Sequence, residues 1–184
     1  MIQIENIQVP DASKIVQFIK SEKIKDKSIG TRMIYVTMDI TAPLYWWGEF
    51  YNYRIETVTY SCSPMHKIAE KEFTLNDFSY EHLCNDELAL LEEVIFRLNM
   101  NRVLFIAKND KHVMSDECYV KYKKTLWKQM IQLLPSSYNQ NNNIKTNYEE
   151  LRKMYYAKQS SNIDEWVIFC QAIKTLPDFK ELCL

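Results

Sequence analysis

The residues best suited to chemistry lie between Thr41 and Lys67, where a tryptophan-rich segment leads into an arginine and then into small polar side chains. Arg54 can hold a phosphate group in the planar fork of its guanidinium. The hydroxyls and thiol that follow are small, so donors of the backbone and side chains can approach a ligand closely. They belong to Thr57, Thr59, Ser61, Cys62 and Ser63. This order of residues predicts a loop that binds a phosphorylated ligand.

Two expected elements position this loop. Residues 33–40 alternate in polarity with a period of two, which predicts a half-buried strand. Pro43 then suits the first position of a helix, and the spacing of Leu44, Trp47 and Tyr51 places them on one helix face. The loop with Arg54 follows the end of that helix.

The rest of the chain predicts mostly helices. Residues 2–9 form an expected strand, and polar stretches at 21–30 and 139–143 predict a loop and a flexible break. Apolar spacings of three and four residues and the placement of helix-ending residues predict the helices. Expected helices cover residues 13–19, 65–71, 86–108, 120–134, 147–158 and 163–175. The sequence therefore predicts an α+β fold, mostly helical with a small antiparallel sheet, as a single domain over residues 1–184.

The composition excludes several classes of protein. Lysine and arginine (23) balance aspartate and glutamate (24), which disfavours a nucleic-acid binder. The two glycines cannot supply a glycine-rich nucleotide loop. The five cysteines lack the pairing of a disulfide framework or a zinc site, and the three histidines match no zinc spacing. We therefore expect a cytoplasmic protein without a metal and without a membrane-spanning segment.

Two regions of the chain resemble the flavin-dependent thymidylate synthases. That family carries a strand and a helix leading into R-H-R-x-x-S-x-N-x-x-S-x-R. Here Arg54 stands for the last arginine of R-H-R, and Thr57 stands for the first serine. Thr59 takes the place of the asparagine, and Cys62 or Ser63 that of the second serine. The first arginine and the histidine of the motif are replaced.

The second region follows a Leu-Pro pair, as it does in the family. Asn147 matches the asparagine that opens a helix, and Lys153 stands at a further asparagine. Lys158 stands where the family has the arginine that orients the pyrimidine, so the charge is kept but the fork is lost. Asn162 replaces a histidine, and Glu165-Trp166 resembles an acidic-aromatic pair. Phrases such as ITAPLYWW and LLPSSYNQ also resemble phage proteins distantly related to these enzymes.

The resemblance implies a reaction and its binding residues. In the family, FAD carries reducing equivalents, methylenetetrahydrofolate gives a carbon, and dUMP is methylated at sites between the subunits of a homotetramer. The implied cofactor-binding residues are Arg54, Thr57, Asn147, Lys153 and Asn162. The implied dUMP-binding residues are Ser63, Arg54 and Lys158, with Lys158 at the catalytic position.

Each site residue also has a purely structural interpretation. Arg54 would close the end of a helix, Thr57 would belong to an edge strand with solvated hydroxyls, and Asn147 would cap a helix. Trp46 and Trp47 are assigned to the core. Two functions stay open: a degenerate flavin-dependent thymidylate synthase, or a non-catalytic phage protein that uses the same fold to bind a nucleotide or a host defence protein. The lost arginine-histidine pair favours the second.

Overall fold

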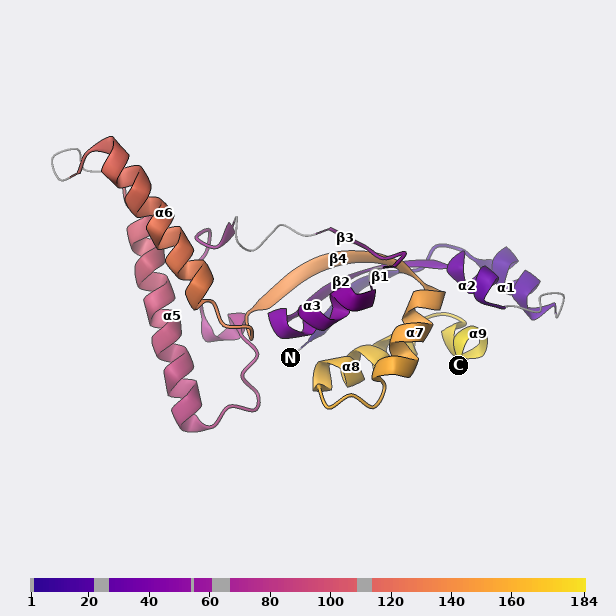
Figure 1. Ribbon diagram of the computed structural model, residues 1–184. Helices are drawn as coiled ribbons and strands as arrows, with labels where there is room; N and C mark the ends of the chain where they lie inside the picture. Colours follow the sequence, from indigo (N-terminus) through magenta and orange to yellow (C-terminus); the bar gives the residue numbers. More distant parts are fainter. Residues whose placement is uncertain (1, 22–26, 54, 61–66, 109–113) are drawn as a thin grey trace. The chain divides into compact units, whose positions relative to one another are not determined.

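The computed structural model describes residues 2–21, 27–53, 55–60, 67–108 and 114–184. The chain divides into two compact units, the first made of Met1–Ser61 with Gln140–Leu184 and the second of Cys62–Asn139. Helices and one four-stranded sheet make up the described part (Figure 1), so the predicted α+β class is confirmed. The assignment of residues 1–184 to a single domain stays a prediction.

The sheet lies almost wholly in the first unit, and its strand order is β1-β2-β4-β3. The strands are β1 (Gln3–Gln8), β2 (Tyr35–Pro43), β3 (Val58–Tyr60) and β4 (Asn139–Asn147). Antiparallel pairing joins β1 to β2 and β3 to β4. Between β2 and β4, Asn141 donates to Thr41 and Asn143 donates to Asp39, so residue numbers rise on one strand as they fall on the other. The short strand β3 therefore forms an edge.

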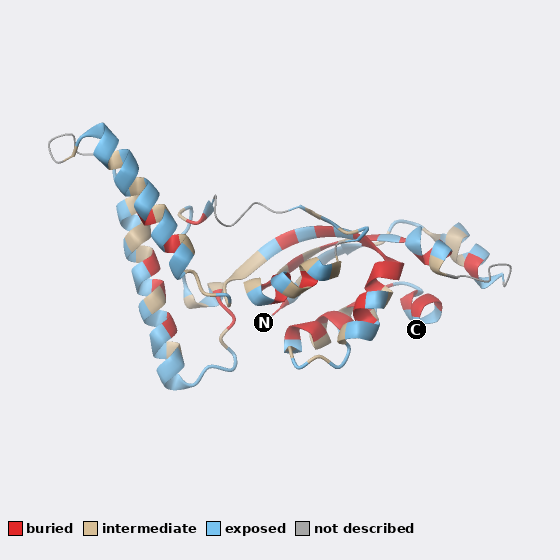
Figure 2. Cartoon of the chain, viewed as in Figure 1, coloured by how far each residue is buried: buried red, intermediate tan, exposed pale blue. Residues whose placement is uncertain are grey.

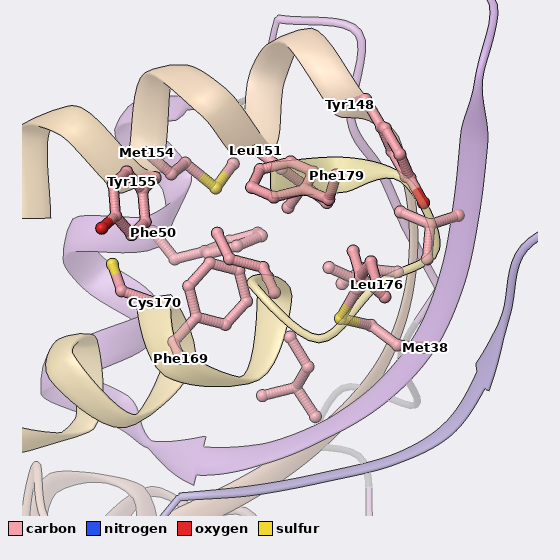
Figure 3. Close-up of a cluster of buried hydrophobic side chains, with 14 of the residues drawn as sticks. Met38, Phe50, Tyr148, Leu151, Met154, Tyr155, Phe169, Cys170, Leu176 and Phe179 are labelled. Carbon is pink, nitrogen blue, oxygen red and sulfur yellow. The ribbon is translucent and has the colours of Figure 1, made fainter. Parts of the chain in front are cut away.

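One face of the sheet carries the hydrophobic core of the first unit. The helices of this unit are α1 (Ser13–Lys20), α2 (Lys27–Arg32), α3 (Leu44–Phe50), α7 (Tyr148–Lys158), α8 (Asp164–Ile173) and α9 (Phe179–Cys183), and the 3-10 turn η1 (Tyr51–Tyr53) follows α3. Figure 3 shows Met38 of β2 beside Leu176, in one cluster with Phe50, Leu151 and Phe169 from three of the helices. Buried positions accordingly concentrate on β2, β4, α7 and α8 (Figure 2).

The tryptophan pair belongs to this core, as predicted. Trp46 is 0% exposed and Trp47 is 1% exposed. The Trp46 ring packs against Trp166 with 4.8 Å between centroids and against Phe50 with 5.0 Å. The Trp47 indole donates to the carbonyl of Gln140 at 3.0 Å, which ties α3 to β4. Neither ring is left free to stack on a ligand.

The prediction of a flexible break at 139–143 is wrong, because this stretch begins β4. Asparagine disfavours strands, but packing and cross-strand contacts override that preference. Asn142 is fully buried and its amide donates to the Tyr51 hydroxyl at 3.3 Å. Its neighbours on the opposite sheet face, Asn141 and Asn143, bond to β2. These three asparagines thus serve as strand residues once their side-chain amides have partners in the protein.

Three other elements differ from the sequence prediction. The expected loop at 21–30 contains the start of α2, where Gly30 packs so closely on Ile19 that an added Cβ would lie 2.4 Å from its Cγ1. The predicted strand β1 contains a bulge at Asn6 (φ 51°), which interrupts its pairing with β2, and Ile7 is exposed. The helix α9 follows Pro177, where an end of helical structure was expected.

The second unit is built on a hairpin of two long helices, α5 (Asn85–Ile106) and α6 (Asp116–Leu133). Both helices were predicted, and α6 begins four residues earlier than expected because Ser115 caps it by accepting from the Cys118 amide. The 3-10 turn η2 (Leu75–Asp77) confirms the expected turn at residues 76–77. The expected helix at 65–71 starts outside the described residues; of its described part, Lys67 is helical and residues 68–70 form a turn.

The cysteines give a test of this packing. Cys84 and Cys118 are exposed, whereas burial raises the pKa of the Cys170 thiol to about 11 and that of Cys183 to about 12. Since the thiolate is the reactive form, iodoacetamide at pH 8 should modify Cys84 and Cys118 quickly and the buried pair only after unfolding. Mass spectrometry of peptides from native and denatured protein measures this. Labelling of Cys170 in the native protein at the rate of Cys84 would contradict the packing.

Candidate functional site

Most of the described site residues lie along α7 or next to its ends. Thr57 and Asn147 lie at the start of the helix, Lys153 lies near its middle and Lys158 lies at its end. With a rise of 1.5 Å per residue, the two ends are about 16 Å apart. Arg54 and Ser63, the predicted phosphate and substrate ligands, lie outside the described residues.

Asn147 organises the group at the start of α7. Its side-chain oxygen accepts from the amide of Glu150 at 3.0 Å, so the predicted role as an N-cap is confirmed. Its side-chain nitrogen donates to Glu56 at 2.8 Å, and the residue is 1% exposed. Glu56 has a φ of 61°, a left-handed conformation that costs about 1 kcal/mol in a residue other than glycine. Both polar ends of the Asn147 amide are thus used within the protein.

Thr57 joins this group from the residue before β3. Its hydroxyl and that of Thr146 lie 2.8 Å apart, directly beside the cap residue. Thr59, in the edge strand β3, lies opposite Ile144 of β4. Thr59 thus belongs to an edge strand, whereas Thr57 precedes that strand and its hydroxyl is bonded within the protein. Ser61, Cys62 and Ser63 lie outside the described residues.

The first turn of α7 is acidic and mostly buried. Glu149 and Glu150 are each 3% exposed. Lys153 donates to Glu150 at 2.6 Å, and Arg152 and Thr31 donate to Glu149. Burial acts to raise the pKa of Glu149, but these hydrogen bonds outweigh it and hold the pKa below its usual value. Carboxylates of the protein therefore occupy the positive end of the helix, where a ligand anion would otherwise be favoured.

Lys158 is held at the other end of α7 by Glu49 of α3. The Lys158 ammonium donates to Glu49 Oε2 at 2.6 Å, and the same oxygen accepts from the Trp166 indole at 2.9 Å. The ammonium also lies 5.3 Å from the centre of the Trp166 ring. The hydrogen bond from Lys158 holds the pKa of Glu49 below its usual value. The lysine that replaces the family's arginine is thus oriented and neutralised.

Another carboxylate, which is buried, lies on α8 next in sequence to Trp166. Glu165 is 8% exposed and accepts from the Tyr45 hydroxyl of α3 at 2.5 Å. Glu165 and Trp166 are the residues that resemble the family's acidic-aromatic pair, and both bond to α3. Asn162 is exposed in the loop between α7 and α8. Glu165 and Trp166 therefore join α8 to α3, and they are also part of the candidate site.

The sequence prediction missed Glu49, Glu56 and Tyr45. One signal could have found two of them: Tyr45 and Glu49 are four residues apart, so they share one side of a helix that is otherwise aromatic. Polar residues on one stripe of such a helix indicate contacts with charged partners. Glu56 carries no comparable signal, because its role comes from a left-handed backbone conformation.

Known proteins share the fold but little of the sequence. No model of a protein family matches the chain, and no curated protein sequence does. Two crystal structures of the flavin-dependent thymidylate synthase ThyX from Helicobacter pylori, both with FAD and dUMP, match with TM-scores of 0.56 and 0.57. Sequence identities are 14% and 15%, and the matches cover 99% of this chain and 96% and 97% of the ThyX chains.

The resemblance of two short regions therefore extends to the fold of nearly the whole chain. At this identity the likeness establishes the fold and leaves the reaction open. Within the described residues, no three histidine, cysteine, aspartate or glutamate side chains are grouped to hold a metal ion. In that same part of the chain, no helix has both the length and the apolar character needed to cross a membrane.

Replacing Glu49 by glutamine tests the ion pair. Because the folded-state pKa of Glu49 lies below its usual value, the pair stabilises the protein above the ordinary pKa, and this is lost as pH falls through the folded value. Both side chains are partly exposed, so we expect a loss of about 0.5–1 kcal/mol at neutral pH.

Urea unfolding at a series of pH values measures the effect. The difference between Glu49→Gln and the parent protein should shrink toward zero near pH 3. Glu70→Gln, which breaks an exposed pair with Lys67, serves as the control and should cost less. An effect of Glu49→Gln that does not change with pH would contradict the charge-based account.

Replacing Asn147 by alanine should cost about 1–2 kcal/mol of stability, since it removes the cap and the donor to Glu56. Asn147→Asp keeps an acceptor for the cap but sets a carboxylate against Glu56, so it should also destabilise. Thermal unfolding compares both with Asn141→Ala, an exposed asparagine of β4. A neutral Asn147→Asp protein would show that the bond to Glu56 contributes little.

Proposed function

We propose that this protein binds a pyrimidine nucleotide of the dUMP type on the thymidylate synthase fold, without carrying out flavin-dependent methyl transfer. One observation carries the proposal: the two lysines that correspond to family site residues, Lys153 and Lys158, are both held by carboxylates of the protein. The resemblance to phage proteins supports a phage-encoded protein that acts in the host cytoplasm.

The residues at the start of α7 do not fit the pyrophosphate of FAD. A pyrophosphate needs several donors or cations around it. Here Glu149 and Glu150 are buried in the first turn, and Lys153 is bound to Glu150. The Asn147 amide is used by the cap and by Glu56. In the related enzymes FAD supplies reducing equivalents, and a site with this charge would hold it poorly.

The pair at the end of α7 fits a uracil ring better. Uracil has an N–H donor between two carbonyl acceptors. The Lys158 ammonium has three N–H donors and uses one of them in its hydrogen bond to Glu49. The Glu49 carboxylate has a second oxygen that can accept a hydrogen bond. The pair therefore offers a donor and an acceptor side by side. Such a pair can bind a neutral polar ring without the two parallel N–H donors of an arginine guanidinium.

Calorimetric titration with dUMP tests this assignment. We expect saturable binding to the parent protein and a loss of at least tenfold in affinity for Lys158→Gln, which removes the ammonium but keeps a side chain of similar length. Lys128→Gln, a change on α6 far from this pair in the sequence, should bind as the parent does. Equal binding by Lys158→Gln and the parent protein would overturn the role of Lys158.

The second candidate is an active, degenerate enzyme that methylates dUMP with FAD and methylenetetrahydrofolate. The likeness of fold over nearly the full length to ThyX with FAD and dUMP favours it. In that case Arg54, Thr57, Asn147, Lys153 and Asn162 would hold FAD, and Ser63, Arg54 and Lys158 would hold dUMP, with Lys158 at the catalytic position.

The active-enzyme candidate also requires assembly, since the family's sites lie between the subunits of a homotetramer. A protein that binds neither dUMP nor FAD would instead direct the search to a host protein as its partner. These candidates share one fold and differ in what the two ends of α7 contact.

A further inference from the structure

A small cavity of the first unit lies where α1, β2, α7 and α9 begin. Its wall includes Ser13 of α1, Ile34 directly before β2, Tyr148 of α7 and Asp178 directly before α9. The volume is about 200 Å³, below the roughly 300 Å³ at which pockets for drug-sized ligands begin. The cavity is therefore too small for a nucleotide or a flavin and suits a ligand of a few non-hydrogen atoms.

The floor of this cavity is apolar and its rim is polar. Ile34 and Tyr148 are 2% and 0% exposed, and Val16 is half-buried beside them in the wall. Asp11 is exposed, and the Asp178 side chain is 40% exposed. A ligand that fits this arrangement places an apolar body inside and a polar head at the rim.

The hydrogen-bond donors around the cavity are used within the protein, whereas acceptors are left over. The Ser13 amide donates to Asp11 Oδ1 at 2.9 Å, and the Tyr148 hydroxyl donates to the Pro177 carbonyl at 2.7 Å. Pro177 itself has no N–H group. The carboxylates of Asp11 and Asp178 each have a second oxygen that can accept. The head of the ligand must therefore donate hydrogen bonds.

The rim stays negative after the neighbouring positive groups are counted. Asp178 and Glu181 both pair with Lys20, at 3.1 and 2.7 Å. Asp11 stays ionised at neutral pH, because hydrogen bonds from Ser13 hold the pKa of its carboxyl below the usual value. The N-termini of α1 and α9 each add at most about half a positive charge. Three carboxylates thus face one ammonium and about one further unit of positive charge, which leaves about one negative charge.

We propose that this cavity binds a short aliphatic primary ammonium ion, with its alkyl chain against Ile34 and Tyr148 and its ammonium beside Asp11 and Asp178. Such an ion carries one positive charge and three N–H donors, which match the charge and the acceptors at the rim. A neutral alcohol of the same length matches only the apolar floor. This inference is independent of the ligand proposed for the end of α7, since neither Lys158 nor Glu49 lines the cavity.

Methyl NMR of the full chain with labelled valine and isoleucine tests the site, with n-butylammonium chloride as the probe. We expect saturable shifts of the Val16 and Ile34 methyl signals at pH 7. Sodium chloride at the same ionic strength should leave these signals in place, and n-butanol should bind about fivefold more weakly or worse. No saturable shift with n-butylammonium, or equal affinity for n-butanol, would overturn the proposal without the use of any variant.

Two substitutions locate the ammonium. Asp11→Asn keeps an oxygen to accept from Ser13, and Asp178→Asn places a residue that tolerates the left-handed conformation at this position (φ 54°). Each should weaken n-butylammonium binding about fivefold or more.

Glu181→Gln is the matched control, because it removes the other partner of Lys20 from outside the cavity wall. It should weaken binding by about twofold or less, since an exposed charge acting from a distance is screened by solvent. Equal losses in Glu181→Gln and Asp178→Asn would refute a direct contact at the rim. Titration of the Asp11→Asn protein with dUMP should match that of the parent protein, so a failure of either proposal can be told from a failure of the other.

Discussion

The contact between Lys158 and Glu49 fixes the orientation and the charge balance of the side chains at the end of α7. It joins α3 to α7, and through the shared oxygen it also fixes the Trp166 indole of α8. An ammonium held in this way is a poor ligand for a free phosphate, because the anion must displace a carboxylate that is already hydrogen-bonded. The same pair presents a donor beside an acceptor, which suits a polar ring. A lysine in place of an arginine thus changes the chemistry of the site and not only its strength.

At the start of α7, too, the charged side chains are paired within the protein. Buried Glu149 and Glu150 satisfy the positive helix end and draw in Arg152 and Lys153. Carboxylates of the protein thus occupy the N-terminus of the helix, the position at which many nucleotide-binding folds hold the phosphates of a ligand. This stabilises the helix and reduces the pull on an external pyrophosphate. The fold matches that of ThyX, whereas the described charges at the start of α7 are balanced within the protein.

The class of fold, the long helices α5 and α6 and the strand β2 could be predicted from the sequence. So could the helix cap at Asn147 and the burial of Trp46 and Trp47. These depend on periodicity and on local chemistry. It failed at β4, where asparagines become strand residues only through partners on β2, and at α2, where Gly30 packs on Ile19. In the site, it identified Lys158 but not its partner Glu49, which lies 109 positions away in the sequence. The four-residue spacing of Tyr45 and Glu49 marks a polar side of α3 but does not name the partner. Arg54 and Ser63 lie outside the described residues and stay predictions.

The absorbance spectrum of the purified protein, recorded again after incubation with FAD and dUMP and passage through a gel-filtration column, tests the central claim most directly. The account predicts that no flavin absorbance remains with the protein, with or without dUMP, because the described charges at the start of α7 oppose a pyrophosphate. Retention of FAD near one equivalent per chain would contradict it and make the active thymidylate synthase the leading interpretation.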